Sequence, residues 1–223
     1  LTVMMTAAMC VMAEARDLLM LFLSMEGVGL TSYVMAGYMR GSLRSTEASL
    51  KYVLFGAVSS AIMLYGLSLL YGMTGSMSFE GIRASLMTGQ VNNFSLLVAV
   101  ILIFAGMSYK VAAVPFHFWC PDVYEGAPTP VSALFSVGPK AAGFALMIRF
   151  FYSTLAMGPD AAASNPLLSQ VNWPLLIGVI AAVTMTYGNL VALRQDNVKR
   201  MLAYSSIAHV GYLLMGFVLL SDG

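Results

Sequence analysis

Residues 94–114 read FSLLVAVILIFAGMSYKVAAV, an apolar run whose single charged residue, Lys110, lies in its second half. A helix of about 20 mostly apolar residues is long enough to cross the hydrocarbon core of a lipid bilayer. This run therefore predicts a membrane-spanning helix. The rest of the chain repeats the pattern.

Further apolar runs fill the sequence, separated by short polar stretches. None alternates apolar and polar residues as a strand of a membrane β-barrel does. We therefore expect an all-α fold, a polytopic transmembrane helix bundle that forms a single domain over residues 1–223. Besides 94–114, the predicted helices are 1–13 (the end of a truncated helix), 18–39, 49–72, 131–152, 174–193 and 201–220.

The stretches between the runs are predicted to be irregular. A loop rich in Gly, Ser and Thr follows Gly72, and the proline-rich segment 116–130 follows the run at 94–114. A loop rich in Asn, Pro and Ser leads to Trp173-Pro174, which opens the next helix because proline suits a first helical turn. The chain starts with Leu1 and stops just after an apolar run, so we expect an internal piece of a longer protein.

Composition supports a membrane protein and excludes one class of partner. Hydrophobic residues make up 59% of the chain, charged residues 9%, and the mean hydropathy is +0.82. A soluble domain carries roughly 25% charged residues. The formal net charge of +1 gives no attraction for a polyanion, so nucleic acid is not an expected partner.

Lysine and arginine predict the orientation of the bundle. Successive loops alternate between the two membrane faces, so 40–51, 116–130 and 194–200 should share one face. Positively charged loops favour the cytoplasm or its topological equivalent. The shared face holds Arg40, Arg44, Lys51, Arg194, Lys199 and Arg200, against Arg16, Arg83 and Arg149 on the other, so we assign it to the cytoplasm.

Three ionisable residues lie well inside the predicted spans. Glu26 is near the centre of 18–39, Lys110 is in 94–114, and Lys140 is near the middle of 131–152. A charge at the centre of a bilayer costs at least about 2.5–3.5 kcal/mol, and such residues usually face a partner or a hydrated cavity. The three are therefore candidate functional residues.

Two interpretations of these charges are open. A fixed glutamate–lysine ion pair would hold two helices together, but it would use only one of the lysines. A proton relay uses both, because burial favours the neutral amine and an approaching carboxylate favours the charged one. Pro139 and Pro115 remove backbone amide donors beside the two lysines and predict helix breaks of the kind that line ion paths. We favour the relay.

Other polar residues are weaker candidates for a proton path. His117 and His209 could carry protons, since imidazole titrates near neutral pH, or could make ordinary hydrogen bonds at helix ends. Lys51 could snorkel to the interface or pair with Glu47 one turn earlier. Cys10 and Cys120 have no metal-ligand or redox spacing. The sequence shows no metal, flavin or nicotinamide motif, so no cofactor is expected in this chain.

Three longer motifs resemble a known family. They are VPFHFWCPDVYEGAPTPVSA at 114–133, NVKRMLAYSSIAHVGY at 197–212 and STEASLKY at 45–52. The chain is similar over its whole length to the antiporter-like proton-pumping subunits of respiratory complex I, NADH–quinone oxidoreductase, and above all to the subunit N branch. The Pro-Asp-Val-Tyr form of the first motif is typical of that branch.

The resemblance implies roles for residues already singled out. It implies that Glu26 lies in the fifth helix of the family fold, Lys110 in a broken seventh and Lys140 in the eighth. The glutamate and first lysine would form a coupled pair, and the second lysine would pass the proton towards the membrane centre. This chain would hold the first of two inverted repeats and the start of the second, without the exit half of the channel.

The resemblance also implies partners and location. NADH, FMN, iron–sulfur clusters and quinone would bind in partner subunits. The neighbours would be the antiporter-like subunit M, the small membrane subunits and the lipid of a bacterial inner membrane, which corresponds to the mitochondrial inner membrane. Two rival functions remain, a subunit of a multisubunit cation/proton antiporter and a non-pumping structural bundle.

Overall fold

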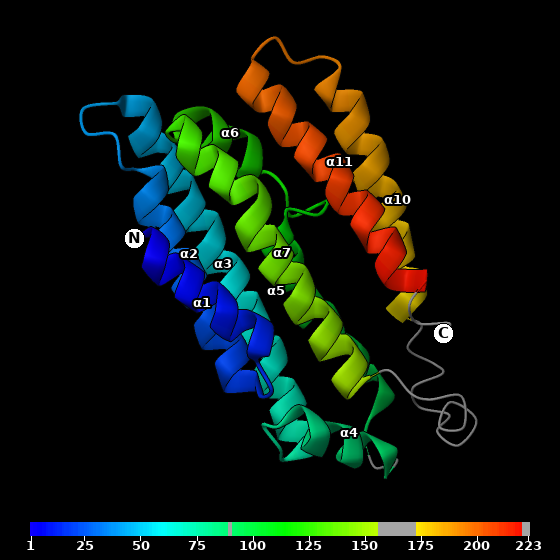
Figure 1. Cartoon of the computed structure of the whole chain (residues 1–223). Coiled ribbons are helices and arrows are strands. Elements are labelled where there is room, and N and C mark those ends of the chain that lie inside the picture. The colour runs from blue at the N-terminus through cyan, green and yellow to red at the C-terminus, as the bar shows by residue number, and fades with distance from the viewer. Residues whose placement is uncertain (89–90, 156–172, 220–223) are drawn as a thin grey trace.

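The computed structural model describes residues 1–88, 91–155 and 173–219, and the regular structure there is helical apart from one isolated β-bridge between Asp17 and Ser78. The helices follow one another along the chain as shown in Figure 1. In order they are α1 (Thr2–Glu14), α2 (Leu18–Ala36), α3 (Leu43–Thr74), α4 (Phe79–Met87), α5 (Asn93–Val111), α6 (Trp119–Gly126), α7 (Thr129–Thr154), α10 (Trp173–Ala192) and α11 (Val198–Leu219).

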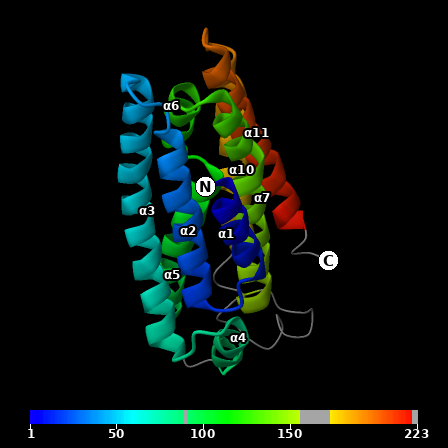
Figure 2. The ribbon, with the colours of Figure 1, turned by 60° about the vertical axis from the view of Figure 1, so that its left-hand side comes forward.

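Six of the described helices, α2, α3, α5, α7, α10 and α11, are long and apolar enough to cross a membrane. They run alongside one another in both views (Figures 1 and 2), which confirms the predicted all-α transmembrane bundle. In α5, 67% of the most apolar window is buried, the largest share of the six, whereas in α10 the share is 22%. The core of the described structure therefore lies around α5.

The turns predicted to share a membrane face lie at one end of the bundle. In Figure 1 the turn after α2, the short helix α6 and the turn between α10 and α11 are at the upper end, and α4 is at the lower end. The turns therefore lie at alternate ends of the bundle, as a chain that crosses the membrane repeatedly requires. The assignment of the upper end to the cytoplasm stays a prediction.

Capping side chains set several helix ends that apolarity alone misplaces. The Ser42 hydroxyl accepts a hydrogen bond from Ser45 N and starts α3 at Leu43, not at residue 49. The polar residues that follow Ser42 are therefore the first turns of the helix. At the other end of the preceding turn, α2 stops at Ala36, before the predicted residue 39.

The loop predicted after Gly72 contains helix α4, so that part of the prediction was wrong. The Ser78 hydroxyl caps the helix by accepting a hydrogen bond from Gly81 N. Phe79, Ile82 and Leu86 are buried at helical spacing. A short amphipathic helix is hard to distinguish from a loop by composition because its outer face is polar.

The segment predicted to be irregular over 116–130 contains α6 and the start of α7, which corrects a second prediction. Two of its three prolines lie in first helical turns, Pro121 in α6 and Pro130 in α7, and Pro128 is the residue that caps α7. The first amides of a helix have no partner within it, so proline is tolerated there. The backbone is non-helical over 112–118, where Ala112 has φ of 64°, and over 127–128.

The helix break predicted at Pro139 does not occur, since α7 continues through this residue. Loss of one amide donor leaves the neighbouring helical hydrogen bonds intact, and spanning helices often accommodate proline in this way. The break next to Lys110 is present, because α5 ends at Val111. The predicted loop before Trp173 and residue 220 lie outside the described residues.

Candidate functional site

Glu26 projects from α2 towards α3 and is half-buried. The Ser60 hydroxyl of α3 donates a hydrogen bond to Glu26 Oε1. A carboxylate that accepts such a bond is held in one position. The half-buried carboxylate thus has a neutral donor from a neighbouring helix.

Lys110 is buried in the last turn of α5, with 4% of its surface exposed. Its Nζ donates a hydrogen bond to the backbone oxygen of Met25, at 3.4 Å. Lys110 and Glu26 line the same cavity of about 10 Å³, but no direct ion pair joins the two side chains, both of which are described. That volume holds about one water molecule.

Aromatic side chains connect this cavity to helix α6. Trp119 Nε1 donates a hydrogen bond to the Tyr109 backbone oxygen at 2.9 Å, directly before Lys110. The Trp119 ring stacks on Tyr52 with ring centroids 4.4 Å apart, and the Tyr109 hydroxyl donates to the Tyr52 oxygen at 2.9 Å. The position of α6 is therefore coupled to the end of α5 that carries Lys110.

Lys140 is buried in α7, with 5% of its surface exposed. Its Nζ donates a hydrogen bond of 2.6 Å to the Ser206 hydroxyl of α11. The ring of Tyr124, from α6, lies with its centroid 5.8 Å from the same nitrogen, within the range of a cation–π contact. Three helices therefore meet at this ammonium group.

Helices α5 and α7 come close together between the two lysines. A Cβ added at Gly143 of α7 would lie 2.8 Å from Val111 Cγ1 and 3.9 Å from Lys110 Cγ. Gly143 lies one turn after Lys140 in α7, so the stem of Lys110 passes the helix that carries the second lysine. Glu26, Lys110 and Lys140 thus lie on three adjoining helices in the described structure.

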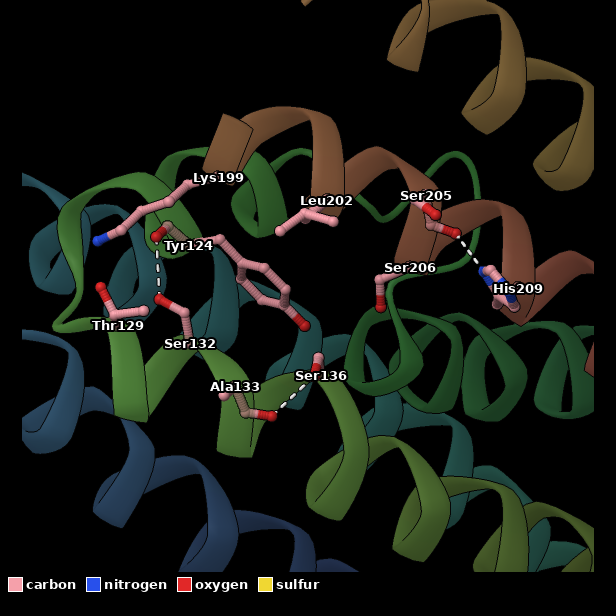
Figure 3. Close-up of a pocket in the computed structure, with 10 residues that line it drawn as sticks. All are labelled: Tyr124, Thr129, Ser132, Ala133, Ser136, Lys199, Leu202, Ser205, Ser206 and His209. Carbon is pink, nitrogen blue, oxygen red and sulfur yellow. Dashed lines mark hydrogen bonds between the residues drawn. The ribbon is translucent and has the colours of Figure 1, made fainter. Parts of the chain in front are cut away.

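A cavity of about 510 Å³ lies between α6, α7 and α11, beside Lys140 (Figure 3). Six of the lining residues carry hydroxyl groups, although most of the wall surface is apolar. Water occupies about 30 Å³ per molecule in the liquid, so the cavity has room for more than ten waters. Its lining residues are Tyr124, Thr129, Ser132, Ala133, Ser136, Lys199, Leu202, Ser205, Ser206 and His209.

A network of ion pairs closes the upper end of the site. Asp122 of α6 accepts from Lys51 Nζ at 2.8 Å and from Arg200 Nη1 at 2.6 Å. Arg200 also reaches Glu125 at 3.0 Å, and Lys51 reaches Glu47 at 2.8 Å. Burial by itself would raise the pKa of the Asp122 carboxyl, but the bonds from Lys51 and Arg200 lower it below its usual value. The network joins α3, α6 and α11.

The weaker sequence candidates occupy three different places. Lys51 lies inside α3 and pairs with Glu47 as one interpretation expected, but it also bridges to Asp122. His117 is buried in the irregular segment with its ring centroid 4.7 Å from that of Tyr187 in α10. His209 is at the edge of the large cavity, where its Nδ1 lies 2.7 Å from the Ser205 oxygen. His117 is thus apart from the residues that line the two cavities.

The immediate partners of the buried charges were not found from the sequence. Ser60, Ser206 and Tyr124 are polar residues of ordinary appearance in or next to apolar runs. Asp122 and Arg200 are 78 positions apart, and their pairing depends on α6 meeting α11. Only Asp122 could have been singled out from the sequence, because it is an acid next to a proline in the motif at 114–133.

A bundle of membrane-spanning helices that carries one half-buried acid and two buried amines defines a polytopic membrane protein with ionisable groups inside the bundle. Comparison with known proteins makes the family explicit. The model of the family described as NADH:quinone oxidoreductase/Mrp antiporter, transmembrane, matches residues 15–223. The chain belongs to this family and is a multi-pass membrane protein.

Individual relatives agree with this assignment. NADH-quinone oxidoreductase subunit N of Anaeromyxobacter sp. (strain Fw109-5) is 54% identical over 224 residues, covering 96% of this chain and 43% of the relative. A chain of respiratory complex I from Thermus thermophilus with bound aureothin has a TM-score of 0.74 and 36% identity, covering 94% of this chain and 42% of that one. The chain spans less than half the length of the curated relatives it matches.

The fold also occurs outside complex I. A chain of the Mrp complex from Dietzia sp. DQ12-45-1b has a TM-score of 0.80 with 24% identity, covering 97% of this chain and 38% of that one. At this identity the likeness concerns the fold alone. The antiporter-like fold expected from the sequence is thereby confirmed.

Proposed function

We propose that this chain is part of subunit N of a NADH–quinone oxidoreductase and translocates protons through a relay of Glu26, Lys110 and Lys140. The relay couples electron transfer from NADH to quinone, in other subunits, to proton movement across the membrane. Family membership and the 54% identical relative support the subunit. The contacts of the three buried charges support the relay.

The observation that carries the relay is the nature of those contacts. Lys110 donates to a backbone oxygen and Lys140 to a hydroxyl, while Glu26 accepts from a hydroxyl. A fixed structural ion pair would place a carboxylate directly against an ammonium. Neutral partners can hydrogen-bond an amine in either protonation state, so each lysine is able to gain and lose a proton in place.

Each of the three groups has a step in the relay. A single water in the small cavity connects Glu26 with Lys110. The proton then passes from Lys110 to Lys140 on the adjoining helix α7, and from there towards the large cavity. Moving one charge through 100 mV takes about 2.3 kcal/mol. Changes in the burial and charge pairing of a lysine can supply a free energy of this size.

The other candidates lie at the margins of this path. His209 is at the edge of the large cavity and is the better placed of the two histidines to exchange protons with water there. His117 would serve a branch towards α10, against which it packs. Lys51 holds α6 to α3 at the upper end, which we assign to the cytoplasm. Its contribution is to keep α6 in position.

The cofactors of the reaction belong to other subunits in this proposal. NADH, FMN, iron–sulfur clusters and quinone act there, and this chain contributes the proton path. Among the described residues, no group of three or more His, Cys, Asp or Glu side chains is arranged to hold a metal ion. The proposed neighbours are subunit M, the small membrane subunits and the lipid of the bacterial inner membrane.

The test replaces the lysines in the full-length subunit within the assembled complex. In inverted membrane vesicles, Lys110→Met and Lys140→Met should each lower the number of protons pumped per NADH oxidised, while the amount of assembled complex stays normal. Arg40→Met, at an exposed residue in the turn after α2, is the matched control for loss of a positive charge. Normal pumping in both lysine variants would support a structural bundle instead.

The antiporter alternative shares the family and the fold, since the family description includes Mrp antiporters. It predicts that proton movement in vesicles depends on a sodium gradient and not on NADH. Proton pumping that starts with NADH and persists without sodium excludes it.

A further inference from the structure

The hydrogen bond from Lys140 to Ser206 is the point at which the buried lysine meets the large cavity. The ammonium group is almost fully buried, and Ser206 Oγ is 2.6 Å from its Nζ. Ser206 also lines the cavity between α6, α7 and α11. The serine hydroxyl therefore stands between the amine and the space that can hold water.

Tyr124 supplies a second, independent observation at the same place. Its side chain is buried, and its hydroxyl makes no hydrogen bond of ordinary geometry among the described residues, although it faces the Ser206 hydroxyl and the Cys120 thiol. In Figure 3 the ring extends across the cavity and the hydroxyl points to the side where Ser136 and Ser206 lie. A buried hydroxyl without a partner is costly, and such groups are usually satisfied by an ordered water.

We propose that the Ser206 hydroxyl is the relay group between Lys140 and a water held at the Tyr124 hydroxyl. This inference rests on the proposed function. In the step, Lys140 gives a proton to Ser206 Oγ while Ser206 releases its own hydroxyl proton to that water. The amine becomes neutral, the serine hydroxyl is re-formed, and the excess proton is in the cavity. The reverse sequence recharges the lysine.

Tyr124 is a positioning residue in this scheme. Its ring is beside the Lys140 ammonium and its hydroxyl holds the acceptor water. The Ser132 hydroxyl donates to the Tyr124 backbone oxygen at 2.9 Å and holds α6 against α7 at this point. Through Asp122, two positions earlier, the ion-pair network keeps the same short helix in place.

A purely structural Ser206 would explain the same bond. In that case the hydroxyl would only hold the lysine side chain, and another residue that packs equally well could replace it without effect on proton transfer. The two roles differ in whether the hydroxyl must exchange its proton, so the rate and its solvent isotope effect distinguish them.

The experiment compares variants of the full-length subunit in the assembled complex, with proton pumping and NADH oxidation measured in the same vesicles. Positioned proton-transfer groups contribute about 10²–10⁴-fold, and a water can partly replace one, so Ser206→Ala should slow pumping by about tenfold. Ser206→Thr keeps the hydroxyl and should stay within about twofold of wild type. Ser68→Ala removes an exposed hydroxyl of α3, bonded to its own helix, and is the control.

The readouts separate the possible outcomes. The relay predicts that Ser206→Ala changes the ratio of pumping rates in H₂O and D₂O, and that Tyr124→Phe slows pumping without loss of assembly. Unchanged pumping in Ser206→Ala overturns the inference, as does an equal loss in Ser206→Thr. Lys140→Met in the same series distinguishes a failure of the Ser206 step from a failure of the proposed proton relay. If Lys140→Met pumps normally, the proposed function itself is wrong.

Discussion

Replacement of Gly126 by alanine tests whether α6 is pressed against α3. A Cβ at this position would lie 2.5 Å from the Arg44 backbone oxygen and 2.6 Å from Ala48 Cβ. Contacts under 3.0 Å essentially do not occur for real Cβ atoms, and backbone cannot swing aside. Helix α6 would have to move away from α3 by roughly 0.5–1 Å, an overpacking that costs about 1–3 kcal/mol.

The displacement would reach the site because Asp122 and Tyr124 lie in the same short helix as Gly126. It would stretch the ion pairs of Asp122 with Lys51 and Arg200, now 2.8 and 2.6 Å long, and move Tyr124 relative to Lys140. We therefore expect Gly126→Ala to lower both the melting temperature of the purified complex by a few degrees and its proton pumping.

The matched control is Gly72→Ala, inside α3. An added Cβ there meets nothing within 4 Å, and alanine favours a helix over glycine by about 0.5–1 kcal/mol. This variant should be neutral or slightly more stable in the same thermal-shift assay. Equal melting temperatures and equal pumping for the two alanine variants would refute the close packing of α6 on α3.

Two further predictions concern the partners of the acids. Ser60→Ala removes the donor to Glu26, a hydrogen bond to a charged group worth about 1.5–3 kcal/mol, so proton pumping in vesicles should fall by about tenfold, with Ser60→Thr close to wild type. Asp122 has a lowered pKa, so its ion pairs stabilise the fold above its usual pKa of about 3.9 and are lost as acid protonates it. Melting temperatures of the purified complex should therefore fall less on acidification in Asp122→Asn than in wild type, and parallel curves would contradict this.

The fold was predictable from the sequence because lipid imposes a simple rule. A span must be apolar over about 20 residues, and α5 and α10 satisfy that rule on their own. Helices α4 and α6 were missed because they are too short to span and begin next to serine or proline, which also occur in loops. Their signals, the Ser78 cap and the first-turn Pro121, are local and are overlooked when only apolar length is counted.

The candidate site was predictable only in its charged members. A glutamate or lysine in a span is conspicuous because it is costly there, so Glu26, Lys110 and Lys140 could be named. Serines are not conspicuous, because their hydroxyls readily bond to their own helix, as Ser32 does to the Gly29 oxygen. Which serine faces a charge depends on the rotation and packing of two helices. Ser206 could be found only in three dimensions.

In the proposed relay the ionisable groups inside the bundle change protonation during turnover, and the Glu26 carboxyl allows this to be observed directly. Infrared difference spectra of the complex with and without NADH report protonated carboxyl groups through their C=O stretch. We expect a turnover-dependent carboxyl band that is absent in Glu26→Gln. Identical difference spectra in wild type and Glu26→Gln would show that this carboxyl keeps one protonation state and would contradict the relay.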